Sequence, residues 1–173
     1  MPVTIDGTNG ITTPAILNAN ANGVGNIGTS VTTFNTIFAK ATSSQYADVA
    51  EFYVADKAYP VGTVLRFGGS AEVTETINSH CTSVAGTVSE NPAYIMNSGL
   101  TAEFTAPVAF LGRVPCRVVG QIKKGDRMVA SEIPGVATAL DPNFYQPGCI
   151  FAKSLENYNS DEVGTIEVVV GRL

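Results

Sequence analysis

The spacing of hydrophobic and polar positions changes near residue 48. Beyond it, short apolar runs alternate with turn-forming stretches such as "YPVG", "FGGS", "KKGD", "EIPG" and "DPNFYQPG". Short runs bounded by Gly and Pro are typical of β-strands. They predict strands at Thr63–Phe67, Thr82–Val88, Val108–Leu111, Cys116–Val119, Arg127–Ala130, Val136–Leu140, Ile150–Leu155 and Thr165–Val170. This pattern, with almost no helical periodicity, predicts an all-β fold, a compact β-barrel or sandwich.

Three segments carry more specific expectations. In "SSQYADVAEFY", Ser44 can cap a helix and the apolar residues follow helical spacing, which predicts one or two helical turns. The run "TIEVVVGRL" is strongly apolar, so the last strand is expected to be central or fully covered. The stretch "KKGD" (Lys123–Asp126) predicts a tight turn in which Gly125 takes a positive φ. It is either a contact with an anionic partner surface or a solvated hairpin tip, and the hairpin tip is favoured.

The first 47 residues form a different kind of segment. They are rich in Asn, Thr and Gly, and their only charged side chains are Asp6 and Lys40. Ordering a residue costs about 1–2 kcal/mol, which the few large apolar residues here cannot offset in a core of their own. Regular apolar spacing and low charge favour burial against copies of the same chain over disorder. The predicted trimer-interface residues are Ile27, Val31, Phe34, Ile37 and Phe38.

The chain is therefore expected to have two parts. Residues 1–47 would be an extended attachment and trimerisation segment, and residues 48–173 the β-domain. The glycines of "NANANGVGNIG" follow no buried strand and open no helix, so they do not predict a phosphate-binding loop.

Composition limits the classes of partner. The 173 residues carry a net charge of −5, and the pI is about 4.8, which offers no basic surface for nucleic acid. No apolar run approaches the roughly 20 residues of a membrane helix, and the N-terminus lacks a signal-peptide pattern. We expect a soluble protein made in a cytoplasm, with neither a membrane nor a nucleic-acid partner.

The cysteines offer little candidate chemistry. Cys81, Cys116 and Cys149 are odd in number and widely spaced, which predicts free thiols packed as small hydrophobic side chains rather than disulfides or zinc ligands. His80 precedes Cys81, but adjacent residues of a strand point to opposite faces, so this pair is not expected to form a catalytic dyad.

Other polar and aromatic residues leave alternatives open. Asp48, Glu51 and Asp56 are either a carboxylate cluster for a cation or acid–base chemistry, or a polar face, and the polar face is favoured. We predict no catalytic residue, no metal site and no cofactor. Tyr94 and Met96, in the turn-like "NPAYIMNSG", are the best candidates for surface contact, either with a neighbour or with the open end of the barrel.

Longer stretches resemble virion proteins of tailed bacteriophages, notably tail-fibre proteins of phages that infect cyanobacteria. The stretch "GNIGTSVTTFNTIFAKATSSQYADVAEFYVADKAYPVGTVLRFGG" is similar to a linker that precedes a β-rich terminal domain in those proteins. The segments "VAGTVSENPAYIMNS", "GRVPCRVVGQIKKGDRMVAS", "PGVATA" and "IFAKSLE" match that terminal domain. The domain is similar in turn to the C-terminal chaperone domains of phage appendage proteins classed as G2 peptidases. The resemblance covers nearly the whole chain from about Gly25.

The resemblance implies a trimerising β-rich module with a place in the virion, assembled in the host cytoplasm, and other virion proteins of the capsid or tail as partners. The first hypothesis is a homotrimeric short fibre, appendage or decoration protein attached through its N-terminal segment.

Two alternatives remain open. A self-cleaving chaperone would cut itself from a fibre, but only about 45 residues precede the domain and no cleavage dyad can be mapped; Asn78–Ser79 and Asn159–Ser160 are weak candidate peptides. A carbohydrate-binding module is the third hypothesis, with no Trp and only 6 Tyr to support it. The sequence favours the structural trimer and no enzyme activity.

Overall fold

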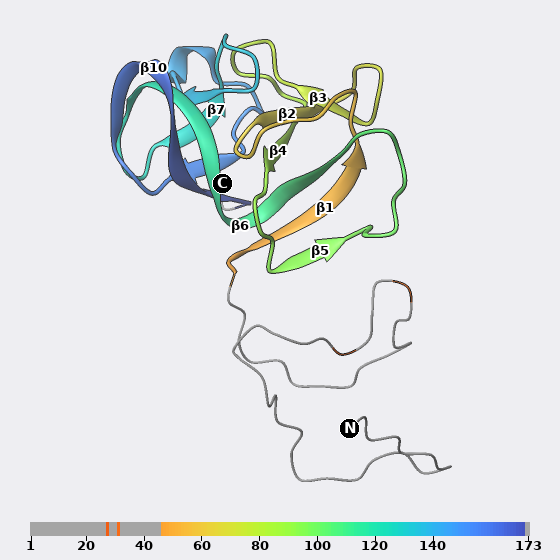
Figure 1. The fold of residues 1–173 in the computed structure, drawn as a ribbon. Helices are drawn as coiled ribbons and strands as arrows, with labels where there is room; N and C mark the ends of the chain where they lie inside the picture. Colours follow the sequence, from red (N-terminus) through yellow and green to blue (C-terminus); the bar gives the residue numbers. More distant parts are fainter. Residues whose placement is uncertain (1–26, 28–30, 32–45, 172–173) are drawn as a thin grey trace, which may run out of the picture. The chain divides into compact units, whose positions relative to one another are not determined.

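Between residues 46 and 171 the chain runs through ten β-strands and one turn of 3-10 helix (Figure 1). This computed structural model describes residues 27, 31 and 46–171, of which 46–171 lie within the unit Ser43–Leu173. The elements are β1 (Asp48–Val54), β2 (Val64–Phe67), β3 (Val73–Glu75), β4 (Val84–Val88), β5 (Tyr94–Met96), β6 (Thr105–Ile122), β7 (Arg127–Ala130), β8 (Ala137–Ala139), η1 (Pro142–Phe144), β9 (Ala152–Ser154) and β10 (Tyr158–Val170). The all-β prediction is confirmed. In the described part, no helix has the length and apolar character to cross a membrane.

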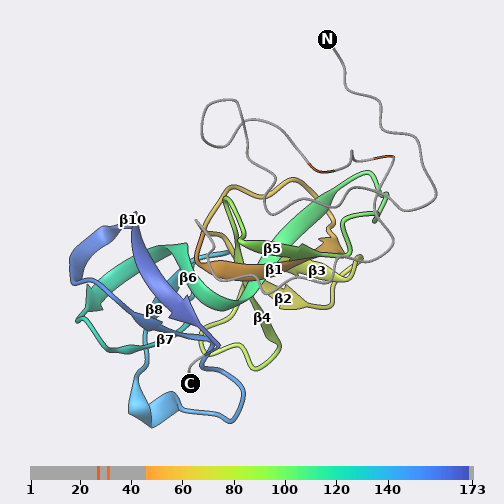
Figure 2. The same cartoon turned by 90° about the horizontal axis from the view of Figure 1, so that it is seen from below.

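Five of the strands close into a barrel (Figure 2). The second half of β6 pairs with β10, β10 with β9, β9 with β7, β7 with β8, and β8 returns to β6 at the pair Val118 and Ala137. Alternate residues of a strand point to one face, so every second side chain in the second half of β6, and in the part of β10 paired with it, points into the barrel. The buried core here includes Val114, Cys116, Val118, Ile166, Val168 and Met128.

The remaining strands extend from the first half of β6. On one side β6 pairs with β1, which pairs in turn with the parallel strand β5. On its other side β6 pairs with β4, which continues to β2 and β3. A second hydrophobic cluster lies here, formed by Ala55, Leu65, Val73, Val88, Ala106 and Val108. Strand β6 therefore belongs to both clusters and joins the barrel to the smaller sheet.

The predicted helical turns near residue 48 are wrong, because Asp48–Val54 is strand β1. The apolar spacing does fit a helix, but β-branched and aromatic residues also favour strands. Pairing with β6 on one side and β5 on the other decides between the two. Long-range hydrogen bonds thus override a weak local preference.

Each predicted strand beyond residue 62 falls on a strand of the structure, but β3 and β5 were not predicted. Val108–Leu111 and Cys116–Val119 are parts of the single 18-residue strand β6. The last strand, β10, begins at Tyr158 rather than Thr165 and has neighbours on both sides, so it is central as expected. The turn at Lys123–Asp126 forms as predicted, with Gly125 at φ 92°.

Candidate functional site

The predicted contact residues Tyr94 and Met96 lie on β5, which pairs only with β1 among the described strands. Tyr94 is 64% exposed, whereas Met96 is half-buried. Strand register places Val49 opposite Tyr94 and, on the other side, opposite Leu111 of β6. Directly paired residues share a face of the sheet, so these three apolar side chains form a row across three strands. We call Tyr94, Val49 and Leu111 the β5 row.

Sequence reasoning missed Leu111 and its neighbour Phe110, both of which are exposed. A register shift between Val49 and Ala50 leaves Phe110 as an extra residue in β6. Such a bulge changes which face the following side chains occupy. The only local sign in the sequence is that "AFLG" breaks the alternation of the strand.

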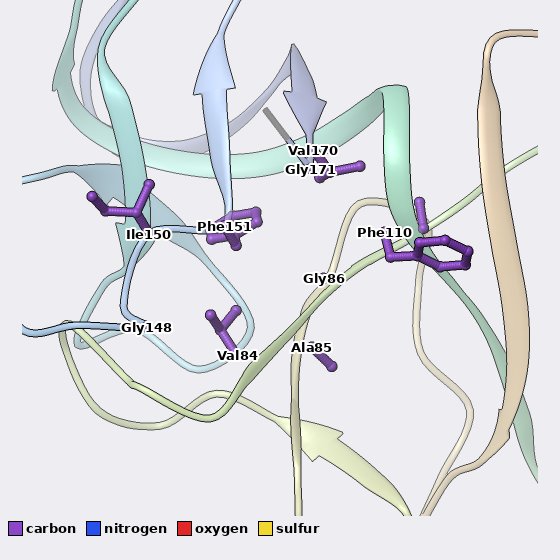
Figure 3. Close-up of a pocket in the computed structure, with 10 residues that line it drawn as sticks. Val84, Ala85, Gly86, Phe110, Gly148, Ile150, Phe151, Val170 and Gly171 are labelled. Atoms are coloured by element: carbon purple, nitrogen blue, oxygen red, sulfur yellow. The ribbon is translucent and has the colours of Figure 1, made fainter. Parts of the chain in front are cut away.

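Phe110 lines an apolar pocket of about 250 Å³ between the barrel and β4. Figure 3 shows Phe151 and Val84 on one side of it and Phe110 on the other. A Cβ on Gly86 would lie 2.1 Å from the carbonyl oxygen of Ala109, so only glycine lets β4 approach β6 this closely. Because the lining residues are all apolar, the pocket suits an apolar side chain rather than a charged ligand.

The one histidine sits in a small hydrogen-bonded group near η1. The Nδ1 of His80 lies 2.7 Å from the hydroxyl of Ser79, and its Nε2 accepts the backbone N–H of Asp141 at 3.3 Å. In a neutral imidazole with Nε2 as acceptor, Nδ1 carries the proton and donates it to Ser79. His80 therefore holds the Ser79 hydroxyl but does not activate it as a nucleophile.

Cys81 contacts Ser83 rather than His80, with its Sγ 3.4 Å from the hydroxyl. All three cysteines are free, and Cys116 and Cys149 are buried. Burial raises the pKa of Cys116 to about 12, against smaller opposing effects of Thr87 and Arg117.

The three carboxylates considered together in the sequence lie in different surroundings. Asp48 is buried, Glu51 accepts the hydroxyl of Tyr53 at 2.8 Å, and Asp56 accepts the hydroxyls of Tyr59 and Thr74. Burial acts to raise the pKa of Asp56, but those two hydrogen bonds, a backbone hydrogen bond and the charge of Lys57 together lower it. Within the described residues, no group of three or more His, Cys, Asp or Glu side chains has the arrangement of a metal site.

Of the predicted trimer-interface residues, two fall in the described part. Ile27 is 79% exposed and Val31 90% exposed. Phe34, Ile37 and Phe38 lie outside the described residues, so the predicted axial packing stays a prediction.

Comparison with known proteins gives a fold likeness. No family model and no curated protein matches the chain. Among solved structures, the chain is similar to the pre-mature gene product 12 of bacteriophage phi29, with 16% identity and a TM-score of 0.57, over 81% of this chain and 24% of that chain. It also matches the N base of the phi29 head fibre gp8.5 at 13% identity, covering 71% of this chain and 93% of that one, but the TM-score of 0.42 is too low for argument. The chain thus spans about a quarter of gene product 12, and the likeness shows a shared fold.

Proposed function

We propose that this protein is a structural component of a tailed-phage virion, a homotrimeric short fibre, appendage or decoration protein. Its N-terminal segment would attach it to the capsid or tail, and its β-domain would face outward. The observation that carries the proposal is the fold shared with phi29 gene product 12 over 81% of the chain. The phage-like motifs of the sequence support it independently of that fold.

The proposed mechanism is assembly rather than chemistry. In a threefold ring, one patch of each chain contacts a different patch of the next, and the rotation closes after three copies. The predicted contact is the low-charge segment, with its regularly spaced Ile27, Val31, Phe34, Ile37 and Phe38. The β5 row, which belongs to the β-domain, would be a second apolar surface for contact with a neighbouring chain.

Native mass spectrometry of the unheated protein tests the trimer. The expected mass is that of three intact chains, and Phe34→Asp should release monomers because three charges would meet in a buried place. Lys124→Ala is the matched control: Lys124 is exposed at the hairpin tip, and its loss should leave the trimer intact. A trimer that survives Phe34→Asp would rule out axial packing of this segment.

A self-cleaving chaperone is the second candidate, and one observation favours it. The solved gene product 12 is described as pre-mature, which implies a later mature form of that protein. If this chain matured by cleavage, the denatured sample would contain a discrete shortened chain beside or instead of the full-length one. A single full-length mass would leave the structural trimer as the better account.

A further inference from the structure

A second pocket, of about 270 Å³, lies where β1 begins beside β6. Its walls come from the first residues of β1, the loop after β4, and the outward faces of β6 and β10. The polar and charged side chains that line it include Asp48, Ser89, Glu90, Asn91, Arg113 and Glu167. We call it the β1 pocket.

Two buried polar atoms in the β1 pocket lack partners. Asp48 is 4% exposed and Ser89 is 3% exposed. Within the described part of the chain, no hydrogen bond reaches Oδ2 of Asp48 or Oγ of Ser89. Buried polar groups are nearly always paired, because an unpaired one loses its hydration and gains nothing in return. Both residues line the pocket, so a donor bound there would lie next to the two side chains that lack one.

The backbone around these two side chains is fully engaged. The carbonyl oxygen of Asp48 accepts the N–H of Ala93 at 2.8 Å, and the N–H of Ser89 donates to the carbonyl oxygen of Pro107 at 2.8 Å. On the other side, the N–H of Arg113 donates to the carbonyl oxygen of Ala47 at 3.3 Å. The backbone that carries the two side chains is therefore held by strand and loop contacts that do not depend on a ligand.

The charge of the β1 pocket favours a cation. Three carboxyl side chains line it against the single guanidinium of Arg113, and among the described residues Arg113 forms no ion pair with them. Burial raises the pKa of Glu167, and Glu156, Asp48 and Glu90 add to this effect against the opposing charge of Arg113. The negative charges of these carboxyl groups therefore repel one another, and a bound positive charge would reduce this repulsion.

The donor set distinguishes among cations. A metal ion needs several close ligands, and the described residues bring no three carboxyl, imidazole or thiol groups together for one. An ammonium group is a compact charge with three donors on an apolar stem, so it can reach Asp48 and Ser89 together while the stem packs on Pro115. The planar guanidinium of an arginine ligand suits the pocket less well, because it would have to fit beside the guanidinium of Arg113.

We propose that the β1 pocket binds the ammonium group of a lysine side chain. This goes beyond the assembly proposed above and does not rest on it. The lysine belongs to a neighbouring polypeptide, which the opposite charge of the pocket would recognise.

The test is a titration of the full-length, isotope-labelled protein with n-butylammonium chloride at constant ionic strength, followed by amide NMR. Saturable shifts are expected at Asp48, Ser89 and Glu167. Asp48→Asn should weaken binding by at least about tenfold, since it removes the charged acceptor. Asp161→Asn is the matched control, because Asp161 is an exposed carboxylate outside the pocket, and its loss should leave binding unchanged.

Ser89→Ala gives a second check, because it removes a hydroxyl and leaves every charge of the pocket in place. It should weaken binding by about threefold.

Three results would overturn the proposal. One is the absence of saturable shifts in the natural chain. Another is an equal response to n-butanol, which has the same stem without the charge. The third is saturation of the same amides by calcium chloride at lower concentration, which would make the site a metal site.

Discussion

The three cysteines differ in how accessible their thiols are. Cys116 and Cys149 are fully buried, whereas Cys81 is half-buried. Because burial raises the pKa of Cys116 to about 12, this thiol is both inaccessible and protonated at neutral pH. Thiolates, not thiols, are the reactive form. We expect a thiol reagent such as Ellman's to modify Cys81 alone in the native protein, and all three cysteines in urea.

Cys81→Ser supplies the control for this experiment. It should abolish the native reaction while leaving two thiols to react after unfolding. Rapid native modification of Cys116 would instead mean that the barrel opens at β6.

Substituting Glu167 should increase the free energy of unfolding by an amount that depends on pH. Burial raises its pKa above the unfolded value, so the fold favours the protonated side chain. That contribution is fully present below the unfolded pKa and is lost as pH rises through the folded pKa. Glu167→Gln should therefore raise the free energy of unfolding near neutral pH and leave it unchanged near pH 3. Because the side chain is only half-buried, the gain should not exceed ~1 kcal/mol.

Urea unfolding at both pH values measures this effect. Asp161→Asn, at an exposed carboxylate, should show no comparable difference. A loss of stability in Glu167→Gln that is equal at both pH values would show that the residue acts through packing instead.

At the scale of elements, Gly112 fixes how β1 starts against β6. Its φ is 105°, and an added Cβ would lie 2.1 Å from the carbonyl oxygen of Ala47 and 2.8 Å from the Cα of Asp48. Gly112→Ala should lower the free energy of unfolding by about 2 kcal/mol or more, through backbone strain and a displaced β1. Gly99→Ala is the control: nothing lies within 4 Å of its added Cβ, so its effect should stay within about 0.5 kcal/mol. If urea unfolding shows that Gly112→Ala and Gly99→Ala lower the free energy of unfolding equally, then β1 can shift without cost.

The sequence predicts elements well where the signal is local. β7 coincides with the expected Arg127–Ala130, because turn residues bound an apolar run on both sides. The sequence did not predict strands β1 and β5, because the hydrogen bonds that stabilise them come from partners far along the chain. In addition, the three residues of β5 are too few to show alternation. The sequence also did not show that β6 is one continuous strand, since one half pairs with β1 and the other with β10.

The candidate sites divide along the same line. The exposure of Tyr94 could be predicted from an aromatic residue in a turn-like stretch. The burial of Asp48 could not, because it arises where β1 starts beside β6 and the loop after β4 closes over it. Local sequence thus anticipates surface residues, whereas pockets between distant strands need the fold.

At the scale of the whole molecule, the described residues of both hydrophobic clusters all lie between Ala50 and Val170. Closing the barrel between β6 and β10 removes two edges that would otherwise be open to pairing with another chain. The domain therefore has the ingredients to fold without residues 1–42, and the proposed role of those residues is assembly. Folding and trimerisation should then be separable properties.

Removing residues 1–42 tests this separation. The remaining chain, Ser43–Leu173, should keep a dispersed amide NMR spectrum and a cooperative unfolding transition, because it is a compact unit that retains every described residue of both clusters. Light scattering should find it monomeric, whereas the full chain should be trimeric. If the truncated chain stays trimeric, the trimer interface lies in the β-domain. Substituting Tyr94 and Leu111 with Ser would then test whether the β5 row forms it. A truncated chain that fails to fold would show that the N-terminal segment contributes to the domain itself.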